Sequence, residues 1–596
     1  MRTHPLTIWA KNNWRFIFTF LVPLVFAIMP IMTTRQEAKC GYVILVMACY
    51  WMTEVVPMAV TSLIPVFAFP MFGILSTAEC CLVYMKATNV MFLGGLMVAI
   101  GVEHCNLHKR IALLVILYVG QSPARLMAGF MLVTTFLSMW ISNTATTAMM
   151  VPIVNAILDE LYPNDSRKKR DEMEITDAVN HSGLEMVSTG AENKGFVTDD
   201  PRSQIGADLA SASEVNPDVM TKSEGKEIAE NGDSEPKRTE RDLMARALYL
   251  GVAYSANTGG TGVVTGTAPN LVMMSILANS FSSPTGLNFA TWIAFNLPGM
   301  IICNVLAWLW LQFLFMGLGC KKGGIQKASK EREDAVRRVI SQKYKELGRI
   351  TQHEVTVLIL FLILVALWLF RAPGFIEGWS AIFTHDKKIS DASAAMLIVF
   401  LLFALPSRFE VPWSKEYKNN PPRTGPQPCL SWAPIHEKVP WNIVLLLGGG
   451  FAIAEAAAKS GLSIWLGVQF EGLQVLPKEA IVFLVSLLTA MITEVASNTA
   501  TASILLPVLK EMAINIKVNP IYLMLPATIC CSYAFMLPVA TAPNAIVFSA
   551  ANMKSTDMMK AGFVMNMLCI LVINIMINTL GVAMFDLHNM PEWTAS

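Results

Sequence analysis

Charged side chains are scarce in this sequence. Lys, Arg, Asp and Glu make up 15% of its 596 residues, whereas hydrophobic residues make up 54% and the mean hydropathy is +0.49. Soluble globular chains carry about 25% charged residues, so the scarcity excludes water as the main solvent of this fold. Apolar stretches of about the length needed to cross a bilayer occur at residues 14–32, 355–370 and 561–580. They predict an integral membrane protein.

Other features are also missing. The eleven cysteines form no C-x-x-C pattern and most lie in apolar tracts, which indicates neither a disulfide framework nor a metal site. The formal net charge is only +1, so the overall balance suggests neither nucleic acid nor another polyanion as a partner. No small-residue cleavage signal follows the first apolar run. We therefore expect residues 1–40 to contain a retained first span rather than a signal peptide.

Two polar segments interrupt the apolar pattern. Residues 165–242 carry 11 Lys or Arg against 19 Asp or Glu without apolar periodicity, which predicts a largely disordered cytosolic loop. Residues 320–349 carry 10 Lys or Arg against 4 acids, and Val336 and Ile340 fall on one helical face. This amphipathic pattern predicts an interfacial helix at residues 330–349.

The distribution of positive charge predicts the topology. Arg2, Lys11 and Arg15 near the N-terminus, and the basic segment before residue 350, favour the cytosolic side of the membrane. No Lys or Arg follows Lys560, so we expect an extracellular C-terminus. A cytosolic N-terminus and an extracellular C-terminus require an odd number of spans, and we count about eleven in a multi-pass plasma-membrane protein.

The sequence contains an internal repeat. In the first half, the Ser142-Asn143-Thr144 motif begins 48 positions after Gly94 of a Leu-Gly-Gly triplet. In the second half, the Ser497-Asn498-Thr499 motif begins 49 positions after Gly448 of another such triplet. The two halves thus keep one register, which is the signature of a duplicated structure.

A second pair of motifs supports the repeat. Thr267 begins Thr-Ala-Pro-Asn 125 positions after the serine of the first Ser-Asn-Thr motif, and Thr541 begins the same tetrapeptide 44 positions after the serine of the second. The excess of 81 positions nearly equals the 78 residues of the polar loop. We therefore predict two inverted repeats, at residues 41–350 and 351–596, with the binding site at their interface.

The first Ser-Asn-Thr motif lies in an apolar tract, from Leu126 to Leu158, that is longer than one span needs. Backbone freed by a helix break is tolerated at this depth only where it lines a cavity or a ligand. Hydroxyl, amide and freed carbonyl oxygens suit an alkali cation, whereas helix N-termini suit carboxylate or sulfate oxygens. The polar side chains that interrupt the tract are Ser138, Ser142, Asn143, Thr144, Thr146 and Thr147.

Neither motif cluster contains Arg or Lys. A doubly charged anion bound there would need its charge offset partly by cations bound beside it. Sodium and anion would then bind together or poorly, which gives coupled transport a physical origin. The pattern therefore predicts a cation-coupled secondary transporter.

The motifs also resemble a known family. The paired motifs, with Asn106-Leu107-His108-Lys109-Arg110 and Leu446-Leu447-Gly448-Gly449-Gly450, are similar to the divalent-anion/sodium symporter family, solute carrier family thirteen, and in particular to its di- and tricarboxylate cotransporters. The resemblance covers nearly the whole chain. It implies an all-α polytopic fold with broken helices and two re-entrant hairpins. It further implies a homodimer in which a scaffold holds elevator-type transport domains, with no enzyme activity and no cofactor.

The resemblance implies particular site residues. The first sodium site would be formed by Ser138, Ser142, Asn143 and Gly266, and the second by Thr493, Ala496, Asn498 and Ala540. The substrate would contact Ser142, Asn143, Thr144, Thr267, Ser497, Asn498, Thr499 and Thr541. Ala542 replaces a proline that is common in relatives, so the resemblance is least informative for the conformation of the second hairpin.

The choice of substrate and coupling ion depends on few residues. The second motif ends in a threonine, Thr499, as it does in the dicarboxylate carriers, whereas sulfate carriers often have another residue at this position. We therefore expect succinate or citrate over sulfate as the substrate. Glu54 and Glu494 lie in or beside apolar tracts and could instead relay protons in a proton-coupled carrier. A channel would need no duplicated, occludable site. An intramembrane enzyme would need a nucleophile with a His or Asp partner, and the sequence shows no such motif.

Several polar residues have structural interpretations too. For Glu54, Glu103, Glu455 and Glu494, an ion pair or a helix cap is as consistent with the pattern as a functional role. Gly259-Gly260-Thr261-Gly262 lacks the Gly-Lys-Ser/Thr that completes a phosphate loop. It predicts close helix packing or a re-entrant turn.

Overall fold

The computed structural model describes most of the chain outside one long loop. The chain divides into two units, residues 1–161 with 240–596 and residues 162–239. The predicted loop at 165–242 lies outside the described residues except for 240–242, which are helical and begin α13 (Glu240–Gly259), so the predicted boundary was three residues too late. The structure describes residues 9, 12–120, 122–162, 240–281, 283–316, 330–373, 376–383, 389–409, 425, 427–469 and 476–594.

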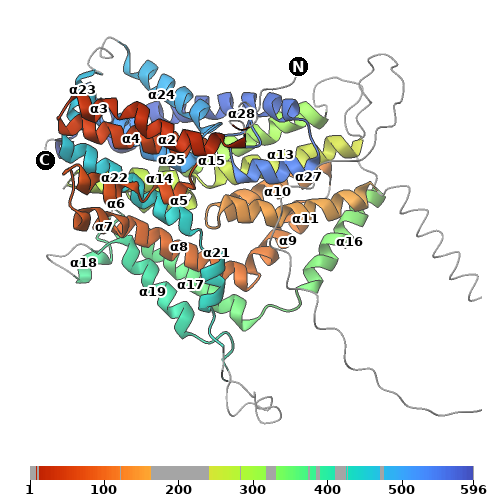
Figure 1. Ribbon diagram of the computed structural model, residues 1–596. Coiled ribbons are helices and arrows are strands. Elements are labelled where there is room, and N and C mark those ends of the chain that lie inside the picture. The colour runs from red at the N-terminus through yellow and green to blue at the C-terminus, as the bar shows by residue number, and fades with distance from the viewer. Residues whose placement is uncertain are drawn as a thin grey trace, which may run out of the picture. The chain divides into compact units, whose positions relative to one another are not determined.

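The described residues are helical almost throughout (Figure 1). In this part of the chain, strand pairing is limited to one isolated bridge between Pro406 and Pro428. Among the described residues, six helical segments are long and apolar enough to cross a membrane. They are Trp14–Met32 (α2 Trp14–Phe26 with α3 Ile28–Met32), Thr77–His104 (α7 Thr77–Tyr84 with α8 Ala87–His104), Phe289–Met316 (α15 Phe289–Leu311 and a π-turn), α17 (Gln352–Leu369), α22 (Trp441–Ser460) and Ser555–Phe585 (α28 Ser555–Met576 through α29 Val582–Phe585).

The remaining helices complete the described fold, and several of them are the halves of broken helices. Those around the two repeat motifs are α9 (Leu107–Val119), α10 (Pro123–Ser138), α11 (Asn143–Leu161), α14 (Ala268–Ser280), α24 (Lys478–Thr493), α25 (Asn498–Asn515), α26 (Pro520–Cys530) and α27 (Ala542–Ala551). The others are α4 (Gln36–Thr53), α5 (Met58–Thr61), α6 (Ile64–Met71), α16 (Lys330–Glu346), α18 (Ser380–Phe383), α19 (Asp391–Ala404), α21 (Trp432–Lys438) and α23 (Leu462–Gln469).

The sequence explains where these helices begin and break. α17 starts where Thr351 and Glu354 form a capping box directly before a continuous apolar run. The first predicted span is split at Ala27, between Pro23 and Pro30, because proline lacks the N–H that a continuous helix needs. All three predicted apolar stretches therefore occur as helices.

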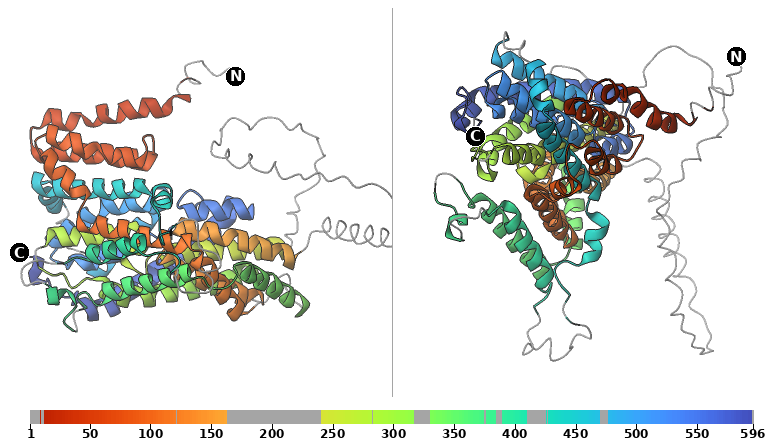
Figure 2. Two further views of the ribbon diagram at one scale, coloured as in Figure 1. Left: turned by 90° about the horizontal axis from the view of Figure 1, so that it is seen from below. Right: turned by 60° about the vertical axis from the view of Figure 1, so that its left-hand side comes forward.

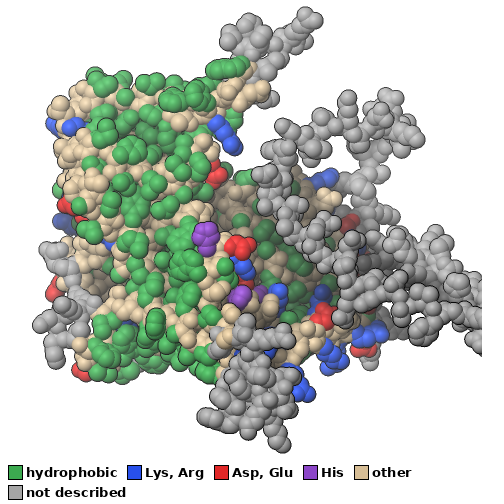
Figure 3. All heavy atoms as spheres, turned by 60° about the horizontal axis from the view of Figure 1, so that its bottom comes forward, with side chains coloured by type: hydrophobic (Ala, Val, Ile, Leu, Met, Phe, Trp, Pro, Cys, Tyr) green, Lys and Arg blue, Asp and Glu red, His purple; other side chains and the backbone are tan. Residues whose placement is uncertain are grey.

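The surface of the fold is apolar. Leu24, Met71, Phe400 and Ile575 are each more than 60% exposed, and Figure 3 shows a broad hydrophobic area on one face. Soluble monomers rarely expose apolar patches of this kind, whereas lipid-facing helices do. In Figure 2 most of the long helices run along a common direction, as expected of a bundle that crosses a bilayer.

Two helices form the centre of the fold. In α13 every residue from Ala247 to Gly259 is buried, and α26 is buried along its whole length. A helix that is buried all round is covered by other helices, and α13 packs against α10, α11, α15 and α27. The halves also interlock, since α14 of the first packs against α25 of the second and α27 of the second packs against α11. The repeat motifs thus meet at the centre.

The predicted interfacial helix is present as α16. It packs against α9 and α11, and its apolar residues Val336 and Ile340 are fully buried. The apolar face that the sequence predicted therefore contacts protein. The location of α16 at a membrane surface stays a prediction.

Candidate functional site

Four helix breaks meet at the interface of the two halves. The Ser-Asn-Thr motifs lie where α11 and α25 begin, after the breaks that follow α10 and α24, at the tips of two helical hairpins. The Thr-Ala-Pro-Asn motifs lie where α14 and α27 begin. Each break thus places one helix C-terminus, with its free carbonyls, beside one helix N-terminus, with its free N–H groups. The predicted interruption of the Leu126–Leu158 tract is confirmed at residues 139–142.

The first hairpin contains a cluster of three oxygens. The Oγ of Ser138 lies 2.5 Å from Oδ1 of Asn143 and 2.7 Å from the backbone oxygen of Ala256 at the end of α13. A hydroxyl carries one proton, so it can donate to only one of these two acceptors at a time. The cluster therefore has more lone pairs than protons, which is the composition of a site for a hard cation such as sodium.

The second hairpin repeats this cluster. The Oγ1 of Thr493 lies 2.8 Å from Oδ1 of Asn498 and 2.8 Å from the backbone oxygen of Cys531 at the end of α26. Thr493 precedes Asn498 by five positions, as Ser138 precedes Asn143. Both hydroxyls are fully buried. The duplication seen in the sequence is therefore also a duplication of local chemistry.

Glycine allows the first cluster to form. A Cβ on Gly260 would lie 2.9 Å from Oδ1 of Asn143 and 3.3 Å from the backbone oxygen of Gly266, so both oxygens face the same small space. A Cβ on Gly266 would lie only 2.4 Å from the backbone oxygen of Gly260. Only glycine fits at such a close approach. The predicted Gly259–Gly262 segment is thus a tight turn that ends α13.

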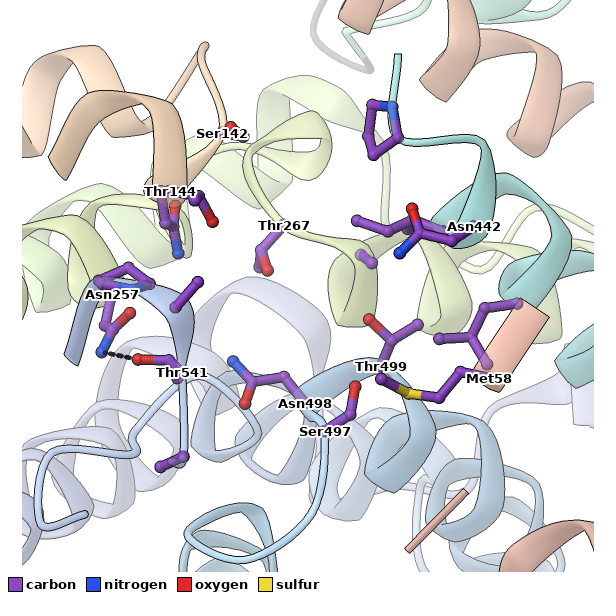
Figure 4. A pocket seen from close by; sticks show the side chains of 18 of the residues that line it. Met58, Ser142, Thr144, Asn257, Thr267, Asn442, Ser497, Asn498, Thr499 and Thr541 are labelled. Carbon is purple, nitrogen blue, oxygen red and sulfur yellow. Dashed lines mark hydrogen bonds between the residues drawn. The ribbon is translucent and has the colours of Figure 1, made fainter. Parts of the chain in front are cut away.

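A cavity of about 560 Å³ lies between the two hairpins. In Figure 4, Thr144 and Thr267 lie on one side of it and Ser497, Asn498 and Thr499 on the other. Its described lining contains no Lys, Arg or His, and its one carboxylate is that of Glu54. Four helices begin at its wall, namely α11, α14, α25 and α27. The cavity therefore offers polar donors and helix N-termini to an anion without any cationic side chain.

The structure brings the predicted site residues together. All eight predicted substrate contacts line the cavity, and so do Gly266, Ala496 and Ala540 of the predicted sodium sites. Ser138 and Thr493 do not line it and lie behind Asn143 and Asn498, to which they are hydrogen-bonded. Ser142 accepts a hydrogen bond from the N–H of Ala145 and so caps α11.

The sequence reasoning missed much of the lining, including Asn257, Asn442 and Met58. Asn257 contributes from α13; its Nδ2 donates to the backbone oxygen of Ala534 at 3.2 Å, and its buried Oδ1 has no partner among the described residues. Asn442 and Met58 contribute from α22 and α5 (Figure 4). An asparagine inside an apolar helix is a detectable signal for the first, whereas nothing in the sequence distinguishes Met58.

The asparagines of the two Thr-Ala-Pro-Asn motifs stabilise the turns. Asn270 Nδ2 donates to the backbone oxygens of Gly260 and Val263, and Asn544 Nδ2 donates to those of Ala534 and Leu537. The acceptors lie ten and seven positions earlier in both halves. Both side chains are fully buried and neither belongs to the described lining of the cavity, so they are structural supports.

The four glutamates of the apolar tracts have different environments. Glu103 pairs with Lys438 at 2.5 Å and Glu455 with Lys86 at 3.4 Å. Glu54 ends α4 in a left-handed conformation and lines the cavity.

Glu494 is buried and accepts hydrogen bonds from the N–H groups of Phe535, Met536 and Leu537 and from Asn566 Nδ2 at 2.7 Å. With four donors around it, Glu494 fixes the turn that leads to Thr541.

Apolar helices broken in duplicate around one cavity are typical of secondary transporters. The sequence profile described as "Sodium:sulfate symporter transmembrane region" matches residues 10–587, and the chain belongs to this family. It is 43% identical to solute carrier family 13 member 2 of Oryctolagus cuniculus, covering 99% of this chain and 96% of the relative. It is 41% identical to the Na(+)/citrate cotransporter of Mus musculus (98% and 97%) and to the Na(+)/dicarboxylate cotransporter 3 of Rattus norvegicus (98% and 95%).

Proposed function

We propose that this chain is a sodium-coupled symporter that imports di- or tricarboxylates such as succinate or citrate. Relatives that share about two fifths of its residues over their full length are named as sodium-coupled citrate and dicarboxylate cotransporters. The chain is accordingly a carrier and not an enzyme, and sodium is its co-transported ion rather than a cofactor.

One observation carries the proposal. A single cavity lies between two oxygen clusters suited to cations, whose Asn143 and Asn498 reach its wall, and has four helix N-termini suited to an anion, without a cationic side chain in its described lining. A dicarboxylate that enters this cavity leaves water without meeting a fixed positive charge, which is costly. Sodium ions in the two clusters would supply that charge. Each ligand would therefore raise the affinity for the other, as linkage requires.

The proposal assigns roles to particular residues. The first sodium would bind Ser138, Ser142, Asn143 and Gly266, and the second Thr493, Ala496, Asn498 and Ala540. The carboxylates would bind the two Ser-Asn-Thr motifs with Thr267 and Thr541. The two motifs lie on opposite sides of the cavity (Figure 4), an arrangement that suits carboxylates at the two ends of a short carbon chain better than one compact tetrahedral ion.

The remaining parts of the proposal concern architecture. The two hairpins would be re-entrant, and their repeats inverted, in a plasma-membrane protein with about eleven spans. The N-terminus would be cytosolic and the C-terminus extracellular. Homodimers would hold two transport domains that move as elevators past a scaffold. The four helix breaks at the wall of one cavity support the membrane-embedded arrangement, since such breaks are tolerated there only beside a cavity.

Uptake of labelled succinate, citrate and sulfate into vesicles that contain the full chain tests the proposal. We expect saturable uptake of succinate or citrate with sodium outside, and none when choline replaces sodium. Saturable sulfate uptake that excess succinate does not inhibit would contradict the dicarboxylate assignment. Uptake that persists in choline and rises with external acidity would favour proton coupling through Glu54, and uptake that does not saturate would favour a channel.

A further inference from the structure

A second cavity, of about 1090 Å³, lies between α9 and α16. Its lining contains Lys and Arg side chains, whereas the described lining of the central cavity contains none. Arg337, Arg338 and Lys345 of α16 line it with one carboxylate, that of Asp334, whereas α9 contributes Leu114 and Tyr118. One wall is therefore cationic and the other apolar.

The helical period separates the two faces of α16. Arg338 and Lys345 are seven positions, or about two turns, apart, so their side chains project from the same face into the cavity. Val336 and Ile340 lie on the other face and are fully buried. The packing of this apolar face against α9 and α11 thus directs the cations away from the protein interior.

A buried arginine fixes the position of α16. Arg110 of α9 is 5% exposed and pairs with Glu354 at 3.0 Å. It also donates to the backbone oxygens of Leu347, Gly348 and Arg349, directly after α16 ends, at 3.0–3.4 Å. Its guanidinium lies 5.6 Å from the ring centre of Tyr344. The cavity is therefore bounded by two helices that are held together, which favours a preformed site.

The positively charged side chains of this cavity do not stabilise the described fold through hydrogen bonds or ion pairs. Within the described part of the chain, no hydrogen bond or ion pair involves the side chains of Arg337, Arg338 or Lys345, and all three are exposed. On the opposite wall, Tyr118 is 83% exposed and Leu114 is 39% exposed. In Figure 3, Lys and Arg side chains gather toward the right-hand side of a largely hydrophobic face. An unpaired cationic wall beside an exposed apolar wall fits an amphiphile with an anionic head.

We propose that this cavity binds an anionic phospholipid of the cytosolic leaflet. Arg338 and Lys345 hold the headgroup phosphate, and an acyl chain lies along Leu114 and Tyr118 of α9. A soluble phosphate compound would use the cationic wall alone, whereas the exposed apolar wall serves only a lipid. Basic pockets between helices on the cytosolic side are typical of lipid headgroup sites. The proposal depends on the cytosolic position predicted for α16 and is independent of which anion the carrier transports.

Native mass spectrometry of the full chain in detergent tests the site with palmitoyl-oleoyl phosphatidylserine, using phosphatidylcholine of the same acyl chains for comparison. We expect preferential binding of phosphatidylserine, and a loss of about tenfold in its affinity in the double variant Arg338→Gln/Lys345→Gln. The matched control, Lys343→Gln/Arg349→Gln, removes two charges from the same region outside the cavity lining and should lose less than about twofold. Tyr118→Gln, at an exposed position, should weaken phosphatidylserine binding by about twofold to threefold.

Several results would overturn the proposal. One is equal binding of the two lipids, and another is an equal loss in both double variants, which would indicate unspecific attraction to positive charge. Displacement by soluble glycerophosphoserine at the same concentration would assign the cavity to a soluble phosphoester. Binding that appears only after removal of residues 165–239 would mean that the acidic loop of this chain occupies the cavity. Since all the substituted side chains lie outside the central cavity, sodium-dependent uptake serves as a check that each variant is folded.

Discussion

The two halves of the site hold the same oxygen arrangement in different ways. In the first half, the turn between α13 and α14 contains Gly260 and Gly266. A Cβ on Gly266 would lie 2.4 Å from the backbone oxygen of Gly260, and a Cβ on Gly260 would lie 2.9 Å from Oδ1 of Asn143. In the second half, the turn at residues 531–541 contains no glycine. The carboxylate of Glu494 holds it instead, by accepting three backbone hydrogen bonds.

The comparison separates what the repeat preserves from what it lets vary. The distances from Ser138 to Asn143 and from Thr493 to Asn498 differ by only a few tenths of an ångström, whereas the supporting residues behind them have diverged. Substitutions of the oxygen ligands should therefore have similar effects in both halves. Substitutions of the supports should have an effect in one half and none at the equivalent position of the other.

The largest effects are expected at the two asparagines. Asn143→Ala and Asn498→Ala each remove a cluster oxygen and an amide donor at the cavity wall, and leave Ser138 or Thr493 with one acceptor fewer. We expect each to reduce sodium-dependent succinate uptake by about thirtyfold or more, or ~2 kcal/mol. Uptake per molecule at the cell surface is the measurement. Normal uptake and sodium dependence in either variant would contradict the equivalence of the two clusters.

A large effect is also expected of Gly266→Ala. Its Cβ would lie 2.4 Å from the backbone oxygen of Gly260, so the turn must move and the first cluster must open. We expect uptake to fall about tenfold or more, since overpacking costs about 1–3 kcal/mol. Ala540 is the equivalent position in the second half, and Ala540→Gly is the control, with less than about threefold change expected. Wild-type uptake by Gly266→Ala would refute the role assigned to this close approach.

Glu494→Gln tests the support of the second half. The two carboxylate oxygens of Glu494 accept hydrogen bonds from three backbone N–H groups and from Asn566. Glutamine offers only one acceptor oxygen, and its NH₂ group would face these donors. We expect a loss of about 1.5–3 kcal/mol in the free energy of unfolding, measured by thermal denaturation in detergent, with several-fold lower uptake. Met139 occupies the equivalent position in the first half, three residues before its motif, and Met139→Leu should change neither quantity. Equal effects of both substitutions would remove the asymmetry.

The smallest effect is expected behind the cavity wall. Ser138→Ala and Thr493→Val remove only a hydroxyl that lies outside the lining. Each should raise the sodium concentration for half-maximal uptake about threefold to tenfold, and should leave the ranking of competing anions unchanged. Sodium titrations with succinate, citrate and sulfate as competitors give both quantities. A changed anion ranking at unchanged sodium dependence would assign these hydroxyls to the substrate.

The part of the site that carries side-chain chemistry could be predicted from the sequence. A polar motif in an apolar tract breaks a helix, and the break recurs wherever the motif recurs, so Asn143 and Asn498 identify both hairpin tips. The interruption by polar residues and the matching register were sufficient for this.

The contributions of backbone and of distant helices could not be predicted in this way. The oxygens of Ala256 and Cys531 complete the two clusters, but a backbone carbonyl leaves no trace in residue type. Met58 and Asn442 reach the cavity only because α5 and α22 pack beside the hairpins. The end of the polar loop was misplaced because Glu240 and Asp242 are as polar as the loop, although acids are favoured in the first turn of a helix.

Equilibrium binding of labelled succinate to the purified full chain, measured as sodium replaces choline at constant ionic strength, tests the central claim most directly. The claim is that sodium supplies the positive charge that the cavity wall lacks. We expect no saturable binding in choline, a succinate affinity that rises steeply with sodium concentration, and loss of this rise in both Asn143→Ala and Asn498→Ala. Succinate binding of equal affinity in choline and in sodium would contradict the account.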